Sequence, residues 1–208
     1  MEQAPNENFG LLMTDPYRRV FDSLVAAGWK VRERDPESGL TATELWPAAL
    51  RERYPDIPSS LTEFLARIDK CVNPSDSAWF LTAADYAGTG DTVWAWNEWE
   101  KQELETFADD EKEKAEIRAF WSEYLPFYLD VGGDYAYFAV RVTDPRPKKP
   151  EFWFLREAPE PPRGAVVWGA DVDMRGVSIV AGSFPEFLEH LTSLMRNPAV
   201  ETPLSGLV

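Results

Sequence analysis

The sequence predicts one α+β domain, and three patterns in its 208 residues carry that prediction. Residues 121–142 hold two apolar runs separated by Gly132-Gly133-Asp134, which is typical of an antiparallel hairpin. Residues 14–28 and 183–194 place apolar side chains at helical spacing, so a helix is expected near each end. The proline-rich stretches fall between predicted strands, and no repeat or linker divides the chain. We therefore expect residues 1–208 to form a single domain.

The second strand of the hairpin alternates in a way that predicts one buried and one solvated face. The buried side is expected to carry Ala136, Phe138, Val140 and Val142, and the solvated side Tyr135, Tyr137, Ala139 and Arg141. The first strand is expected to begin at Trp121 and to continue through Leu125, Phe127 and Leu129. The two glycines tolerate the positive φ of a tight turn, which makes the strands antiparallel neighbours.

Caps and stop signals place the elements before the hairpin. Thr14, Asp15 and Pro16 predict a helix start, and Gly28 predicts its end. A short strand is expected at 29–32, a helix between Pro47 and Pro55, and a capped helix with Leu61, Phe64, Leu65 and Ile68 on one stripe. Residues 78–81 predict a further strand, and residues 87–91 predict a loop.

Two helices are expected between this loop and the hairpin. The first holds Trp96, Trp99, Glu103, Leu104 and Phe107. The second starts at Asp109-Asp110-Glu111, whose charge suits a helix N-terminus, and has Ile117, Phe120 and Trp121 on its apolar side. Residues 100–130 contain ten acidic and four basic residues, so this stretch has a net charge of −6.

The chain after the hairpin is expected to supply more strands and a closing helix. Strands are predicted at 151–155, 165–168 and 177–181. Ser183 is expected to cap a helix whose apolar stripe consists of Phe184, Phe187, Leu188, Leu191 and Leu194. The last residues, 197–208, are predicted to form a loosely held tail.

The composition restricts the class of partner and the compartment. The chain has 36 acidic and 21 basic residues and a net charge of −15, which repels nucleic acid and anionic membranes and favours cationic partners. Cys71 is the only cysteine, so an intramolecular disulfide and a thiolate zinc cluster are excluded. No secretory signal is recognisable, and no apolar run reaches the roughly 20 residues that cross a bilayer. We expect a soluble, cytoplasmic protein.

An ordered set of motifs resembles the SMI1/KNR4 superfamily, also called SUKH. The family pattern is similar to a Pro-x-x-Leu-x-x-Phe-Leu helix, a Pro-Phe strand, Gly-Gly-Asp-x-Tyr and a closing Ser-Phe-x-x-Phe-Leu helix. Comparable motifs follow one another here over about residues 45–195, with the tyrosine directly after Gly-Gly-Asp. The matching positions are Pro58, Leu61, Phe64, Leu65, Pro126, Phe127, Gly132, Gly133, Asp134, Tyr135, Ser183, Phe184, Phe187 and Leu188. The acidic insert at 88–118 and the proline strip after Val142 depart from the family pattern.

The resemblance implies a curved, mainly antiparallel sheet with flanking helices. On this pattern the core spans about 45–195, the N-terminal helix at 14–28 packs on it, and the tail at 197–208 is loose. The resemblance also implies a bacterial immunity protein that binds and neutralises a polymorphic or contact-dependent toxin, without catalysis or a cofactor. Eukaryotic members of the family imply an alternative, a scaffold or regulatory protein-interaction module.

A tryptophan-rich, acidic segment supplies the candidate binding residues. Tryptophans surrounded by charge are typical of interface anchors, and acids complement the cationic surface that a nuclease toxin needs to hold phosphates. The candidates for partner binding are Trp94, Trp99, Glu100, Glu103, Asp130, Asp134, Asp171 and Asp173. The same tryptophans could instead form core, and the acids a solvated face. The partner is expected to be a cognate toxin or another basic protein, with the chain itself a monomer or weak homodimer.

Three further features of the sequence could serve in catalysis or metal binding, but their neighbouring residues favour a structural role. His190 lies beside the stripe of the last helix without a recognisable Ser or Cys nucleophile motif, so a surface histidine is expected. Cys71 is expected to be a buried or half-buried thiol. Asp171 and Asp173 could hold a hard cation in a metal-assisted hydrolase, but the spacing lacks the remaining ligands of a calcium loop. We expect no metal site and no catalytic residue.

Overall fold

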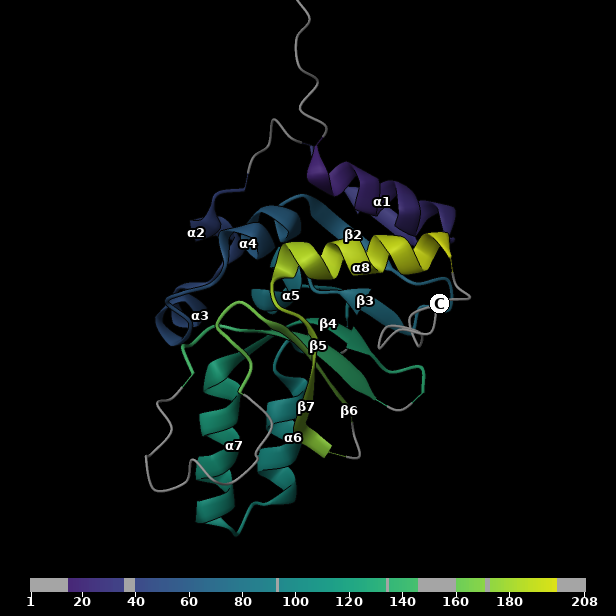
Figure 1. The fold of residues 1–208 in the computed structure, drawn as a ribbon. Coiled ribbons are helices and arrows are strands. Elements are labelled where there is room, and N and C mark those ends of the chain that lie inside the picture. The colour runs from purple at the N-terminus through teal and green to yellow at the C-terminus, as the bar shows by residue number, and fades with distance from the viewer. Residues whose placement is uncertain are drawn as a thin grey trace, which may run out of the picture.

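The computed structural model describes residues 15–35, 40–92, 94–133, 135–145, 160–170 and 173–197. In these segments seven strands form one antiparallel sheet, with the strands side by side in the order of the sequence. Helices lie on both sides of the sheet (Figure 1). The predicted α+β class is therefore confirmed.

The strands form a meander that has two different ends. They are β1 (Lys30–Glu33), β2 (Ile68–Val72), β3 (Ala78–Phe80), β4 (Tyr124–Asp130), β5 (Ala136–Arg141), β6 (Val166–Ala170) and β7 (Asp173–Ala181). Because neighbours are antiparallel, the short β2–β3, β4–β5 and β6–β7 connections fall at one end, which we call the turn end. The longer connections, including all helices between strands, start and finish at the opposite end.

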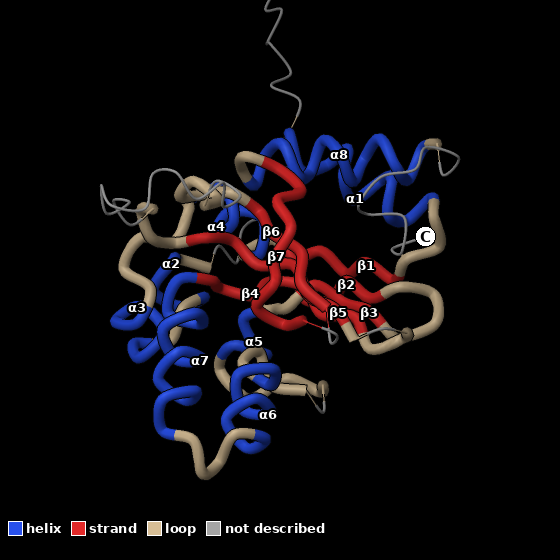
Figure 2. The backbone as a smooth tube through the Cα atoms, turned by 60° about the horizontal axis from the view of Figure 1, so that its bottom comes forward, coloured by secondary structure: helices blue, strands red, loops and turns tan. Residues whose placement is uncertain are grey.

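Eight helices complete the described part of the fold. They are α1 (Pro16–Ala26), α2 (Ala42–Leu45), α3 (Ala48–Arg53), α4 (Ser59–Leu65), α5 (Ala83–Tyr86), α6 (Glu98–Thr106), α7 (Glu111–Glu123) and α8 (Phe184–Arg196). Helices α1 and α8 lie together on one side of the sheet, and the α6–α7 pair lies on the other (Figures 1 and 2). No helix in the described segments is long and apolar enough to cross a membrane.

The two terminal helices follow their sequence signals. Asp15 caps α1 by accepting a hydrogen bond from the Tyr17 N–H at 3.1 Å, and Gly28 adopts a φ of 87° just after the helix. Ser183 caps α8, accepting from the Glu186 N–H. The predicted stripe of α8, from Phe184 to Leu194, is buried.

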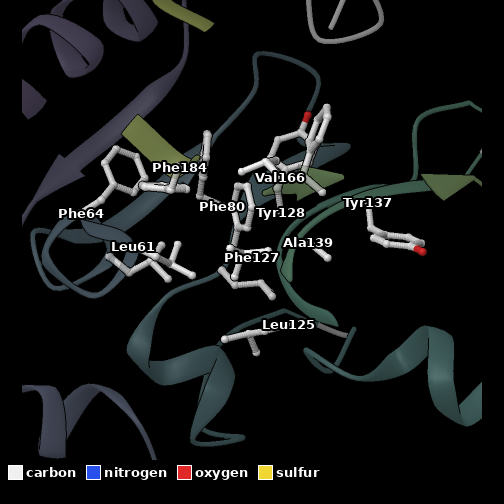
Figure 3. Packing of buried hydrophobic residues seen from close by; sticks show 14 of the residues in the cluster. Leu61, Phe64, Phe80, Leu125, Phe127, Tyr128, Tyr137, Ala139, Val166 and Phe184 are labelled. Carbon is white, nitrogen blue, oxygen red and sulfur yellow. The ribbon is translucent and has the colours of Figure 1, made fainter. Parts of the chain in front are cut away.

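An aromatic core fills the space between the sheet and α8. Phe127 of β4 packs against Phe184 and Phe187, with ring centroids 5.2 and 5.3 Å away, and Phe64 of α4 approaches Phe80 and Phe184 in the same way. Figure 3 shows Phe64, Phe80, Phe127 and Phe184 of this group. Edge-to-face contacts of this kind add to the burial of apolar area. Helix α4 therefore joins α8 on this face through the residues of its predicted stripe.

The opposite face of the sheet is covered as well, which corrects the predicted solvated face of β5. All six residues of β5 are buried, because Tyr137 packs under Trp121 of α7 at 5.0 Å and leaves no room for a side chain at Gly169. Arg141 is only 1% exposed and pairs with Glu123 and Glu160. Alternation shows only which side chains share a face, and it cannot show that both faces are covered.

Several element boundaries also differ from the prediction. Trp121 belongs to α7, which runs into β4 without a loop, so the first hairpin strand starts at Tyr124 rather than at Trp121. Ile68 begins strand β2, which the sequence reading merges with the preceding helix. Trp96 precedes α6 instead of lying in it. The expected strand at 151–155 and the tail from 198 onward lie outside the described residues.

Two short helices, α2 and α5, are absent from the sequence prediction. Each begins with a capping box, in which a threonine and an acid three residues later bond to each other's backbone. The pairs are Thr41 with Glu44 and Thr82 with Asp85. The signal was therefore present, but four residues are too few to show an apolar period.

Candidate protein-binding site

The turn end of the sheet gathers one part of the predicted binding residues. The register pairs Asp130 with Ala136, Ala136 with Ala170, and Ala170 with Asp173, so Asp130 and Asp173 lie in one row across four strands. Asp134 and Asp171 lie outside the described residues, as does the side chain of Asp173. The β2–β3 turn adds Asp76 at the same end, where Val131 donates its N–H to the Ser77 carbonyl.

Three aromatic rings connect this end to the segment before α6. Trp94 is half-buried, and its ring centroid lies 5.0 Å from that of Trp99 and 5.6 Å from that of Tyr135. Tyr135 follows the β4–β5 turn and is 39% exposed. The two outer rings, Trp94 and Tyr135, therefore offer an aromatic surface at the turn end. Asp130 lies opposite Ala136 in the register, so its side chain is on the other face of the sheet from Tyr135.

Trp99 is the inner ring of this group, which corrects its placement on a partner-binding surface. Its side chain is 2% exposed and lies under Trp94 and Tyr135. A partner that contacts Trp94 cannot touch Trp99 unless the Trp94 ring is displaced. The core alternative is thus the one that the structure supports for Trp99.

Asp130 has an unusual environment for a surface carboxylate. The Gly132 N–H donates to its Oδ1 at 2.7 Å. Partial burial raises the pKa of Asp130 above its usual value, although this hydrogen bond opposes the shift. Asp130 remains half-exposed and is available to a partner.

Glu100 is also buried within the domain, which corrects its predicted exposure. It accepts two hydrogen bonds of 2.8 Å from the guanidinium of Arg53 in α3, and its side chain is 8% exposed. The pair is bidentate and joins α6 to α3. A carboxylate committed in this way supports the fold and does not present a charge to a partner.

Glu103 has a comparable structural role. It accepts a hydrogen bond of 2.6 Å from the Trp121 indole and pairs with Arg175 of β7 at 3.1 Å, with its side chain 12% exposed. Burial raises the pKa of Glu103, and the partners Trp121 and Arg175 act against that shift. Arg175 also pairs with Glu113, so it holds both α6 and α7 against the sheet.

Sequence reasoning missed Tyr135 and Arg175 as members of these groups. Tyr135 could have been found, because it completes the Gly-Gly-Asp-Tyr motif and was expected to be solvated. Arg175 had no such signal, since its acidic partners come from a distant part of the chain.

Two of the residues considered for catalysis, His190 and Cys71, lie in surroundings that do not favour it, and the side chains of Asp171 and Asp173 lie outside the described part. His190 lies on the exposed side of α8, where its Nδ1 is 3.2 Å from the Val180 carbonyl oxygen. Cys71 is fully buried in β2, and burial raises the pKa of its thiol, which disfavours the nucleophilic thiolate. Within the described ranges, no three acidic, histidine or cysteine side chains are grouped so that they could hold a metal ion.

The geometry thus divides the eight candidates into three sets. Trp94 and Asp130 reach the surface at the turn end, Trp99, Glu100 and Glu103 stabilise the attachment of α6, and the side chains of Asp134, Asp171 and Asp173 lie outside the described part. No family model, curated protein or solved structure matches this chain.

Proposed function

We propose that this chain is an immunity protein of the SMI1/KNR4 type, which neutralises a basic toxin by stoichiometric binding and not by catalysis. The observation that carries the proposal is the turn end, where Trp94 and Tyr135 form a partly exposed aromatic surface. The ordered motifs of the sequence and the antiparallel sheet flanked by helices agree with this type of fold.

The charge of the chain suits a cationic partner. With a net charge of −15, the protein attracts a nuclease-like toxin over a distance and raises the rate of encounter. The final affinity then depends on a few desolvated anchors, for which tryptophan and tyrosine are the preferred residues. Trp94 and Tyr135 are placed to be those anchors, and Asp130, which is half-exposed at the same end of the sheet but on its other face, offers a carboxylate to a lysine or arginine of the toxin.

The proposal is tested by co-expressing the chain with the product of a neighbouring toxin-like gene and measuring the complex by gel filtration and calorimetry. We expect a stable complex, in which Trp94→Ala and Tyr135→Ala each weaken binding by about tenfold or more. Phe107→Ala is the matched control, because Phe107 is 38% exposed but lies just past the other end of α6. Its affinity should stay within about twofold of the parent's.

The outcomes separate the proposal from its alternative. A complex that forms equally well with both turn-end variants places the interface elsewhere. If no toxin-like gene adjoins this one, or no complex survives gel filtration, the immunity function is rejected. A partner encoded elsewhere, with no gain in toxin sensitivity on deletion, would favour a scaffold or regulatory module.

A further inference from the structure

A cavity of about 510 Å³ lies beside the outer strands β1–β3, and it shares Trp94 with the proposed protein-binding surface. One wall comes from β1 and β2, including Arg32 and Lys70, and Trp79 of β3 lines it as well. The remaining wall comes from the segment that contains α5 and ends at Trp94. This volume is within the range of small-molecule sites, roughly 300–1,000 Å³.

The wall on β1 and β2 carries two cations whose side chains form no ion pair within the described residues. Arg32 and Lys70 are directly opposite each other in the strand register, so their side chains share one face of the sheet. Both side chains are exposed, and neither makes an ion pair or hydrogen bond in the described segments, although the charge of Lys70 contributes to the lowered pKa of Asp76. Like charges in opposite positions repel, and an anion between them converts this repulsion into attraction.

Two of the four aspartates that line the cavity are paired with cations, and a third is held by hydrogen bonds. Asp69 pairs with Arg34, and Asp76 pairs with Lys30 at 2.5 Å. Asp85 is buried; it accepts hydrogen bonds from the backbone and hydroxyl of Thr82 and, on its other oxygen, from Thr92. Asp91 is exposed on the opposite wall, where it repels the anionic group of a ligand. Such a group is therefore favoured on the side of Arg32 and Lys70.

Trp79 gives the cavity an aromatic wall with an unused donor. Its side chain is 6% exposed, and its indole N–H has no acceptor in the part of the chain that the structure describes. Buried indole N–H groups usually have a partner. Trp94, Val72 and Val131 supply further apolar surface around it.

We propose that this cavity binds a small organic anion. Its carboxylate or phosphate lies between Arg32 and Lys70, and its planar or apolar body packs against Trp79 and Trp94. A carboxylate and a phosphate share the chemistry that the two cations recognise, so the test must separate these two sources.

The test uses the full chain and two pairs of probes. Indole-3-acetate and its neutral parent indole represent a carboxylate on a ring, and adenosine monophosphate and adenosine represent a phosphate. Each is titrated by calorimetry and by the indole N–H resonances in NMR spectra. We expect saturable binding of one of the anions, at least tenfold tighter than its neutral counterpart, with a shift of the Trp79 resonance.

Matched charge variants identify the site. The double variant Arg32→Gln, Lys70→Gln should weaken the bound anion at least tenfold, and it should fold normally because both side chains are exposed and unpaired within the described structure. Lys112→Gln with Arg118→Gln removes two exposed cations from α7 and should leave binding unchanged. The inference is overturned if neither anion saturates, if the Trp79 resonance does not move on binding, or if the two double variants behave alike.

Discussion

Individual carboxylates at the turn end differ in how the fold affects their protonation. Partial burial raises the pKa of Asp130, whereas the Lys30 ammonium, which donates to Asp76 at 2.5 Å, lowers the pKa of that residue. The two aspartates therefore contribute to stability with opposite dependence on pH. Because Asp130 and Asp76 lie at the same end of the sheet, each serves as a control for substitution of the other.

The effect of Asp130→Asn on the free energy of unfolding, relative to the parent, should become more stabilising as the pH rises. Because the folded-state pKa is raised, the contribution of Asp130 to stability is fully present below its unfolded pKa and is lost as the pH rises through the folded value. Asparagine keeps an acceptor for the Gly132 N–H and does not titrate. The free energy of unfolding of Asp130→Asn, relative to the parent, should increase from about pH 4 to about pH 7 in urea titrations.

Asp76→Asn is the control with the opposite sign. The lowered pKa of Asp76 means that its contribution is present above the unfolded pKa and is lost as the pH falls through the folded value. The variant should therefore be less stable than the parent near neutral pH. The difference between their free energies of unfolding should shrink as the pH falls. Parallel pH profiles for the two variants would contradict the assignment of opposite environments.

At the level of elements, buried charges attach the α6–α7 pair to the rest of the domain. Arg53 of α3 binds Glu100 of α6, and Arg175 of β7 binds Glu103 and Glu113. These contacts compensate for the weak apolar character of α6, in which only Trp99 and Glu100 are buried. The part of the acidic insert from residue 98 onward therefore consists of the packed helices α6 and α7 and the turn between them.

Removing Arg53 should destabilise the domain much more than removing an exposed lysine. In Arg53→Met, Glu100 keeps its charge at a site with 8% exposure, and the expected loss is about 3 kcal/mol, the low end for a broken buried pair because Arg53 is 28% exposed. Lys112→Met breaks an exposed pair with Glu116 and should cost about 0.5 kcal/mol or less. Urea unfolding of both variants measures the difference, and equal losses would show that the Arg53–Glu100 pair is not structurally important.

The elements that sequence predicts well are those whose signals are local. The caps and stripes of α1 and α8, the β4–β5 hairpin and the burial of Cys71 depend on neighbouring residues. The burial of both faces of β5 depends on α7 and α8 packing from opposite sides, which no alternation reveals.

The same distinction applies to the candidate site. The aromatic and acidic character of the 94–103 segment was readable, but the burial of Trp99 and Glu100 depends on Tyr135 and Arg53 from elsewhere in the chain. The grouping of Asp130 with Asp173 follows from sheet order, which is a tertiary property. Sequence thus identified the residue types of the site, and the contacts decided which of them reach the surface.

For the molecule as a whole, the excess of acids should make stability depend on salt. A net charge of −15 destabilises the compact folded state through self-repulsion, and added salt screens that repulsion. The exposed ion pairs act in the opposite direction, but each contributes little. Buried pairs such as Arg53–Glu100 are screened much less. Raising sodium chloride from about 0.02 M to about 0.3 M, over which the Debye length shortens severalfold, should therefore raise the melting temperature.

A charge variant separates screening from other effects of salt. Glu105→Lys with Glu189→Lys changes two exposed acids on α6 and α8 that form no ion pair within the described segments. Each replacement changes the charge by +2, so the net charge goes from −15 to −11. This variant should be more stable than the parent at low salt, and the advantage should vanish at high salt. Glu105→Asp with Glu189→Asp keeps the net charge and should retain the parent's salt dependence. If the parent melts at a lower temperature as salt rises, local ion pairs outweigh the net repulsion and the argument fails.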